Sequence, residues 1–285
     1  MDSVIHKCSF DNWYPVFRKD TVRGAYIELP DEFVNYLLNG EFFVDEKMFP
    51  GLSEEFQKLT KELGRNVFIK LNFSAPTDAQ WIGPQRTLDV QTFEQAIYLL
   101  KASTRIMLDL TNPFGEDIKE KVKPVLVLKK SFDYKRGREF RIFYKNPETY
   151  WISSRYGDVP CEIEQEAVEE KVRDFIKKYE NYFGTDKYIL DLYISPKMRC
   201  HLVDMAPWNE ATSPSMFEWD DIKKMENIKV MLASDTLILP RDEPPVPVEL
   251  LGDASLEEII ASMKDLDNLS NEEYNEKDGI NFDIN

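Results

Sequence analysis

Alternating apolar and polar positions at residues 67–73 predict a β-strand with one apolar face. Lys70 and Asn72 share the other face of this strand. Because Pro76 cannot continue a ladder, we expect the strand to end near Ser74. A lysine on such a strand is most simply a solvated residue at the edge of a sheet, so its role depends on the rest of the chain.

Other segments carry the same two kinds of period. Apolar residues at helical spacing, with capping signals at their ends, predict helices at 31–38, 53–63, from Thr92 onward and at 162–183. Apolar and alternating runs predict strands at 24–29, 124–130, 139–144, 149–155, 187–194 and 200–205. The strands follow one another as antiparallel hairpins more than as strand–helix–strand units, which favours an α+β fold with mixed or antiparallel sheets.

The pattern weakens after about residue 225. A proline-rich stretch at 239–250 interrupts it, one short amphipathic helix is expected from Ser255, and residues 267–285 are expected to be disordered. Residues 242–285 hold 13 Asp/Glu against 2 Lys, a net charge of −11 out of −16 for the chain. The body is therefore nearly neutral, which argues against nucleic acid as a partner and allows the tail to meet a basic protein surface.

Composition limits the class of protein further. The chain has 285 residues, 42% of them hydrophobic, which is enough for a substantial core. No run approaches the ~18 apolar residues of a membrane span, and the N-terminus has no apolar signal core, so we expect a cytoplasmic protein. Three cysteines without a CxxC pair and only two histidines favour neither a disulfide framework nor a zinc site.

The last predicted hairpin brings two carboxylates together. If its turn is centred between Lys197 and Met198, Asp191 lies opposite Asp204 on one face, and Val203 points the other way. Like charges in this position destabilise a sheet, so either one is protonated or a cation such as Mg²⁺ lies between them. An odd-length turn that moves one aspartate to solvent fits the pattern equally well, and both interpretations remain open.

Cations on the other predicted strands suit the phosphates of a nucleotide. Lys70, Lys130, Arg141 and Arg155 lie within strands or directly after them. The strand edge at 130–132 offers backbone groups with which an adenine can pair. The sequence contains neither GxxxxGK[ST] nor GxGxxG, so it supports neither a P-loop nor a Rossmann site.

Several stretches occur in a recognisable order over about residues 8–225: CSFDNWYPVFRKDTVRGAYIELP, KLNFSAPTDAQWI, PVLVLKKSF, GREFRIF, ISSR, YILDLYI and HLVDMAPWNEATSPSMFEW. They resemble the cell division cycle protein 123 (D123) family. The resemblance implies an ATP-grasp-like fold that holds ATP and Mg²⁺ between an N-lobe, about 1–123, and a C-lobe, about 124–240, before an acidic tail at 241–285. It also implies a monomeric assembly chaperone for translation initiation factor two, which binds the C-terminal part of the factor's gamma subunit.

The site of the family carries over residue by residue. Lys70 and Arg141 would meet phosphate, Glu139 would meet the ribose, and 130–132 would form the adenine hinge. The implied ATP-binding residues are Lys70, Ser74, Ala75, Asp78, Lys130, Ser131, Phe132, Glu139, Arg141, Arg155, Asp191 and Asp204. The implied magnesium ligands are Asp191 and Asp204.

Two positions depart from the family. Ala206 stands where the family has a metal-binding asparagine, and alanine cannot coordinate, so water or Asn209 would take that place. Ser131 replaces an aromatic residue at the hinge, which reduces packing on adenine and leaves backbone pairing in place. Two alternatives to the chaperone stay open. One is an ATP-grasp ligase that forms an acyl phosphate, which Ala206 counts against; the other is an interaction module without nucleotide, which Ala206 and Ser131 favour.

The partner surface has two interpretations. Trp13, Tyr14 and Phe17 suit exposed anchors of an interface, since aromatic residues often carry binding energy. Core packing in the N-lobe explains the same residues equally well.

Overall fold

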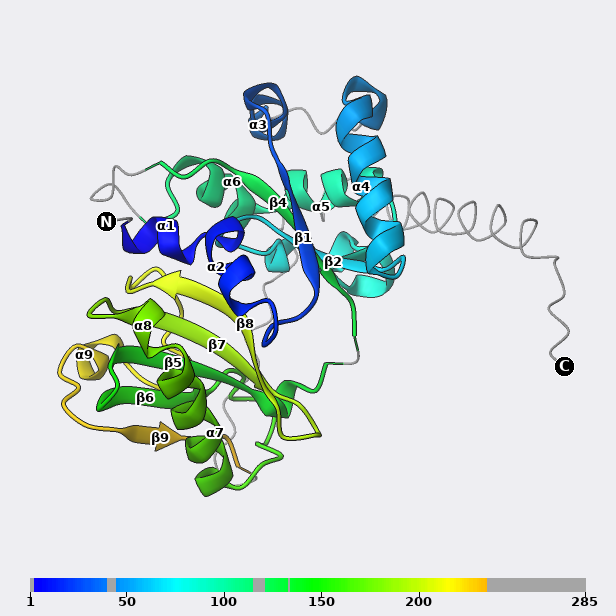
Figure 1. Cartoon of the computed structure of the whole chain (residues 1–285). Helices are drawn as coiled ribbons and strands as arrows, with labels where there is room; N and C mark the ends of the chain where they lie inside the picture. The colour runs from blue at the N-terminus through cyan, green and yellow to red at the C-terminus, as the bar shows by residue number, and fades with distance from the viewer. Residues whose placement is uncertain (1–2, 40–44, 115–120, 133, 235–285) are drawn as a thin grey trace, which may run out of the picture.

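The structure, a computed structural model, describes residues 3–39, 45–114, 121–132 and 134–234. The chain forms two lobes, each built on a sheet (Figure 1). The first sheet has the strand order β1-β4-β2-β3 and the second the order β8-β7-β5-β6-β9. The helix expected from Ser255 and the acidic tail lie outside the described residues.

The first sheet is antiparallel throughout. Its strands are β1 (Gly24–Glu28), β2 (Val67–Lys70), β3 (Asp89–Val90) and β4 (Val125–Lys130). The helices of this lobe are α3 (Asp31–Leu38), α4 (Pro50–Leu63), α5 (Phe93–Ala102) and α6 (Thr104–Thr111), with 3₁₀ turns η1 (Glu46–Met48), η2 (Thr77–Ile82) and η3 (Pro84–Arg86). The capping signal predicted at Thr92 is confirmed, since Thr92 and Gln95 form a capping box at the start of α5. The predicted end of β2 near Ser74 is wrong, because the Leu71 N–H donates to the Ser74 carbonyl over 2.8 Å and turns the chain back.

The second sheet is antiparallel except where β6 and β9 pair. Its strands are β5 (Glu139–Asn146), β6 (Thr149–Ser154), β7 (Tyr188–Ile194), β8 (Cys200–Pro207) and β9 (Lys229–Met231). The helices are α7 (Gln165–Lys178), α8 (Glu180–Phe183) and α9 (Trp219–Ile222), and η4 (Arg136–Arg138) precedes β5. A single helix was predicted at 162–183, and both its start and its continuity are wrong. The helix begins at Gln165, and it is interrupted at Tyr179, whose φ of −113° and ψ of 16° lie outside the helical region.

Two helices at the start of the chain were not predicted. They are α1 (Val4–Cys8) and α2 (Phe10–Phe17), which lie between the two lobes in Figure 1. Trp13 and Phe17 are fully buried and pack with residues of the second lobe, such as Leu202. The interpretation of these two residues as exposed interface anchors is therefore wrong, and they belong to the core.

The strand β4 connects the lobes. It pairs with β1 and β2, so the first sheet continues past residue 123 to Lys130, and the chain then enters β5 of the second sheet. The division of the chain into two domains near residue 123 stays a prediction, because the pairing of β4 describes the sheet and not the domains.

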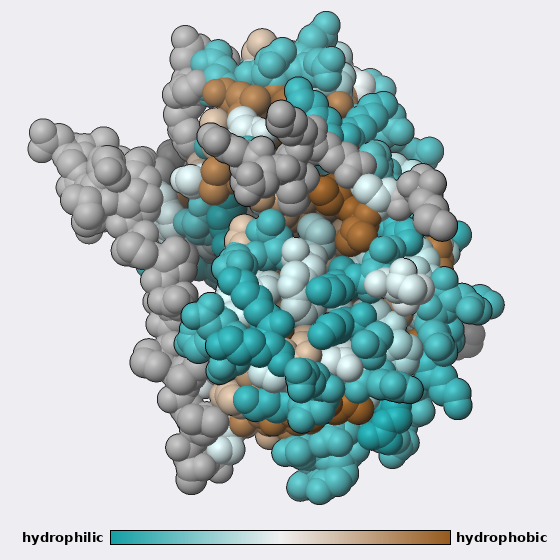
Figure 2. Space-filling view, turned by 90° about the vertical axis from the view of Figure 1, so that its left-hand side faces the viewer, coloured by the Kyte–Doolittle hydropathy of each residue, from teal (hydrophilic) through white to brown (hydrophobic). Residues whose placement is uncertain are grey.

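On the face shown in Figure 2, hydrophilic side chains predominate and hydrophobic ones appear in separate patches. None of the helices in the described ranges combines the length and hydrophobicity that a bilayer span requires.

Candidate functional site

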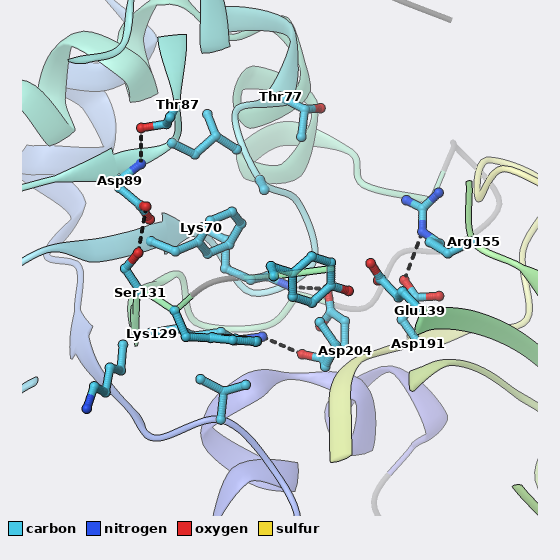
Figure 3. Close-up of a pocket in the computed structure, with 18 of the residues that line it drawn as sticks. Lys70, Thr77, Thr87, Asp89, Lys129, Ser131, Glu139, Arg155, Asp191 and Asp204 are labelled. Atoms are coloured by element: carbon cyan, nitrogen blue, oxygen red, sulfur yellow. Dashed lines mark hydrogen bonds and ion pairs between the residues drawn. The ribbon is translucent and has the colours of Figure 1, made fainter. Parts of the chain in front are cut away.

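A cavity of about 380 Å³ lies between the two sheets and is lined by residues of both. The first lobe contributes Phe68, Lys70 and Lys129, which come from the central strands β2 and β4. The second lobe contributes Glu139, Asp191, Val203 and Asp204 from β5, β7 and β8. Figure 3 shows Lys70 and Lys129 on one side of this cavity and Glu139, Asp191 and Arg155 on the other.

The register of β2 and β4 decides which lysines enter the cavity. Phe68 pairs with Lys129, and Lys70 pairs with Val127. Since paired residues of antiparallel strands share a face, Phe68, Lys70 and Lys129 project together toward the second lobe. Lys130 alternates to the other face, where its Cε lies 3.8 Å from the position that a Cβ on Gly64 would occupy. Lys130 therefore lines only the margin of the cavity.

Lys129 is the cavity cation that the sequence reasoning missed. Its ammonium donates to the Val203 carbonyl and lies 5.5 Å from the ring centroids of both Phe10 and Trp13. Burial lowers the pKa of Lys129 to about 8, although Asp204 acts in the opposite direction. The signal was the pair of lysines at the end of an apolar strand, but only the register with β2 tells which one faces inward.

The carboxylate pair predicted from the hairpin is confirmed, since Asp191 lies directly opposite Asp204. The predicted turn centre is wrong. Ile194 pairs with Cys200, and the register shifts between Asp191 and Leu192, so a tighter turn is compensated by a bulge at Val203. The bulge also turns Val203 toward the cavity, contrary to the prediction, because the extra residue breaks the strand alternation.

Side-chain cations offset the repulsion between the two carboxylates. Lys70, which is 2% exposed, forms an ion pair with Asp204 across the lobes. Arg141 donates to both oxygens of Asp191 at 2.8 and 2.7 Å, and Arg155 Nε lies 3.4 Å from the same carboxylate. Burial alone would raise the pKa of Asp191, but the two arginines hold it below its ordinary value.

Glu139 differs from its neighbouring carboxylates. Burial raises its pKa well above the ordinary value, and the negative charge of Asp191 adds to the rise. Arg155, Arg141 and a hydrogen bond with Tyr156 act against it. One cavity thus holds two carboxyl groups in opposite environments: that of Glu139 opposes ionisation, and that of Asp191 favours it.

Three of the implied site residues do not line the cavity. Arg141 is committed to Asp191 and to the Ser213 carbonyl, which accepts at 2.7 Å. Asp78 accepts hydrogen bonds from the Ser103 hydroxyl and the Arg105 N–H, at the start of α6. Ser74 donates its backbone N–H to Asp109 at 2.6 Å, while its neighbour Ala75 lines the cavity.

The hinge segment lies at one end of the cavity, where Ser131 and Phe132 both line it. The backbone N–H groups of Lys130 and Ser131 already donate to the carbonyls of Arg23 and Asn66. Phe132 is 41% exposed, and its ring centroid is 5.6 Å from that of Tyr193. The hinge therefore offers an aromatic edge more readily than the backbone donors of these two residues.

The residues that could hold a metal are few. Across the described ranges, no group of three or more His, Cys, Asp or Glu side chains is arranged as a metal site. Ala206 pairs with Ile189 and packs against an apolar cluster, and Asn209 is held by the Phe114 carbonyl at 3.2 Å and the Ala211 N–H at 2.7 Å. The expectation that Asn209 reaches the site is not met. Two carboxylates still fit Mg²⁺, which takes its remaining ligands from phosphates and water.

Comparisons with known proteins agree with this architecture. A profile of the D123 family matches residues 44–247. The Translation initiation factor eIF2 assembly protein of Xenopus tropicalis is 29% identical over 263 residues, covering 78% of this chain and 78% of that protein. The protein of the same name from Schizosaccharomyces pombe is 28% identical over 320 residues, covering 95% and 98%.

Two solved structures are also similar to this chain, to different degrees. The structure of Cdc123 from Schizosaccharomyces pombe is similar with a TM-score of 0.70 and 28% identity, covering 80% of this chain and 99% of that chain. A RimK domain protein ATP-grasp from Sphaerobacter thermophilus is less similar, at a TM-score of 0.39 and 12% identity, covering 74% and 59%. The mixed α+β fold predicted from the sequence is confirmed by the Cdc123 match.

Proposed function

The chain belongs to the D123 family, and on this premise we propose that it acts in the assembly of translation initiation factor eIF2. The relatives reported above carry the name eIF2 assembly protein, and the Schizosaccharomyces pombe protein matches 95% of this chain. We further propose that the partner is the gamma subunit of the factor, as the resemblance of the sequence implies. Both statements concern function, and binding to purified subunits tests them directly.

We also propose that the cavity between the lobes binds ATP together with Mg²⁺. The observation that carries this proposal is the set of opposed charges: Lys70 and Lys129 of the first lobe face Asp191 and Asp204 of the second across a single cavity. Arg155 lies on the side of the carboxylates, next to Asp191. A phosphate oxygen would take the place of the Asp204 carboxylate on Lys70, and Mg²⁺ held by Asp191 and Asp204 would supply positive charge to the phosphates. Arg141, already bound to Asp191, would then orient that carboxylate and would not touch phosphate.

Ligand binding in this cavity has to compete with existing ion pairs. The Lys70–Asp204 pair joins the lobes in the structure described here. A nucleotide would insert between these two side chains and give each a new partner. Because both partners are exchanged together, Mg²⁺ and ATP should bind with strong mutual dependence, and neither should bind tightly alone.

The experiment is a calorimetric titration of ATP into the full chain, with and without Mg²⁺. Wild type, Asp204→Asn and the control Asp220→Asn are compared, since the Asp220 side chain is 88% exposed and lies outside the cavity lining. We expect Mg²⁺-dependent binding that is lost in Asp204→Asn and kept in the control. Equal binding in both variants would contradict the site.

A nucleotide-free interaction module is the second candidate, favoured by one observation. Within the described residues, Lys70 is ion-paired with Asp204 and Arg141 with Asp191, so these charges balance one another. No binding of ATP to wild type, with intact binding of the gamma subunit, would establish this alternative. Consumption of ATP with formation of a new product from cell extract would instead favour a ligase.

The acidic C-terminal region supports a contribution of charge to partner binding. Residues 242–285 carry a net charge of −11 beside a nearly neutral body. Such attraction raises the rate of association and weakens as salt screens it. Deleting 242–285 should lower the affinity for the gamma subunit and reduce its salt dependence, and unchanged values would contradict this contribution.

A further inference from the structure

At one end of the cavity, Ser131 and Asp89 form a hydrogen-bonded pair that takes no part in the ion pairs described above. The Ser131 hydroxyl donates to Oδ2 of Asp89 at 2.6 Å. The backbone N–H of Asp89 in turn donates to the Thr87 hydroxyl at 3.3 Å, which fixes the backbone from which this carboxylate projects. Figure 3 shows Thr87, Asp89 and Ser131 together at one end, with Glu139 and Arg155 at the other.

The register of the first sheet places this pair in line with the cavity lysines. Asp89 of β3 pairs with Phe68 of β2, and Phe68 pairs with Lys129 of β4. Neighbouring strands lie about 4.8 Å apart, so the row Asp89–Phe68–Lys129 spans roughly 10 Å. An acceptor, an apolar ring and a cation thus follow one another across the face that lines the cavity.

This order matches the order of groups in a nucleotide. The cation end suits phosphate, the ring of Phe68 suits the face of a base, and the carboxylate suits a hydrogen-bond donor at the far edge of that base. Resting on the proposed function, we propose that Asp89, held in place by Ser131, reads the exocyclic amino group of adenine and so sets the base specificity of the site.

The carboxylate can discriminate because only part of it is committed. Oδ2 accepts from Ser131, whereas within the described residues Oδ1 accepts no hydrogen bond. Asp89 is half-buried, and Phe68, Leu88 and Phe132 line the same cavity, so a base that enters there displaces water from this oxygen and has to satisfy it. An amino group satisfies this oxygen, and a carbonyl at the same place on the base repels it.

Hypoxanthine tests this reasoning because it carries a carbonyl where adenine carries the amino group. Loss of a hydrogen bond to a charged group, with an acceptor left unpaired, corresponds to a weakening of about 10- to 100-fold. Wild type should therefore bind ATP more tightly than inosine triphosphate by about this factor. Guanosine triphosphate, which has the same carbonyl, should also bind more weakly than ATP.

The variants are Asp89→Asn and Ser131→Ala, with Asp220→Asn as a remote carboxylate-to-amide control. Displacement of a fluorescent ATP analogue measures the affinity of all three triphosphates for each protein. An amide at position 89 can donate to the carbonyl of hypoxanthine, so Asp89→Asn should reduce the preference for ATP by about tenfold. Ser131→Ala keeps the charge of Asp89 but removes the hydroxyl that orients its carboxylate. The preference for ATP over inosine triphosphate should therefore fall by a smaller factor than in Asp89→Asn. The control should match wild type.

The outcomes separate this inference from the proposed function. ATP binding with an unchanged preference in Asp89→Asn, confirmed as folded by circular dichroism, would overturn the role of Asp89 and leave the nucleotide site standing. Equal affinities of wild type for ATP and inosine triphosphate would do the same. Absence of ATP binding to wild type would overturn the proposed nucleotide site, and the inference would fall with it.

Discussion

Replacing Arg141 by methionine should destabilise the protein, because it leaves Asp191 buried with much of its charge uncompensated. The two side chains are only 7% and 11% exposed, and two hydrogen bonds of 2.8 and 2.7 Å join them. Removing one member of a buried pair costs about 3–5 kcal/mol. Arg155 remains 3.4 Å from Asp191, so we expect a loss near the lower end, about 3 kcal/mol.

Urea unfolding followed by circular dichroism measures this loss. Arg141→Met should lower the midpoint at an unchanged dependence on denaturant, which indicates a change in stability alone. The matched control is Lys123→Met, which breaks an ion pair with Glu28 whose side chains are 64% and 60% exposed. Exposed pairs contribute little, so the control should keep the wild-type midpoint.

A double variant separates loss of charge balance from loss of packing. Arg141→Met together with Asp191→Asn removes the uncompensated charge, so it should recover at least about 1 kcal/mol relative to Arg141→Met alone. If Arg141→Met lies within about 1 kcal/mol of wild type, Asp191 does not depend on Arg141, and the reasoning about this pair is refuted.

Three further predictions concern other residues of the first lobe. The pKa of Lys129 falls from 10.5 to about 8 on folding, so the folded state binds fewer protons than the unfolded state between these two pH values. Wild-type stability should therefore rise by up to about 3 kcal/mol from pH 8 to pH 10.5. An equal rise in the urea midpoint of the Lys129→Met variant would contradict this prediction. Asp109→Ala removes the acceptor of the Phe73 and Ser74 N–H groups, so their hydrogen exchange should speed up by about tenfold, and unchanged exchange by mass spectrometry would exclude this contact. Thr92→Ala removes the side chain that caps α5 and should cost about 1 kcal/mol in urea unfolding, with an unchanged midpoint showing that the cap contributes nothing.

The sequence predicted those parts of the fold that depend on local pattern. The helix at 31–38 agrees with α3 at both ends, and the predicted second helix ends where Gly64 adopts φ 115°. These boundaries depend on nearby apolar spacing and on a residue that tolerates the left-handed conformation, so a single sequence suffices to find them.

The parts that failed depend on contacts between distant segments. Whether Lys129 or Lys130 enters the cavity follows from the pairing of β4 with β2, which the alternation within one strand cannot supply. The opposition of Asp191 and Asp204 was predicted through a turn centre that is wrong, and the bulge at Val203 restored it. Partner strands determine bulges and registers. The sequence therefore predicted that the two carboxylates lie opposite each other but did not predict the bulge that places them there.

The site shows the same division. Opposed cations and carboxylates were predicted as residue types, and the structure places Lys70, Arg155, Asp191 and Asp204 around one cavity. The commitment of Arg141 to Asp191 and of Asp78 to α6 was not predictable, because each depends on which partner lies within reach after folding. Asp89 was missed since nothing in its neighbourhood along the chain points to Ser131, 42 residues away.

The burial of α1 and α2 among strands of the second lobe has a consequence for synthesis of the protein. Phe17 and Leu202 belong to the same core cluster, and Leu202 follows 185 positions later in the chain. At about 5–20 residues per second, roughly 10 to 40 seconds separate the two during translation. Throughout that interval Phe17 lacks its neighbours in the second lobe, so α2 cannot complete its native packing until β8 has been made.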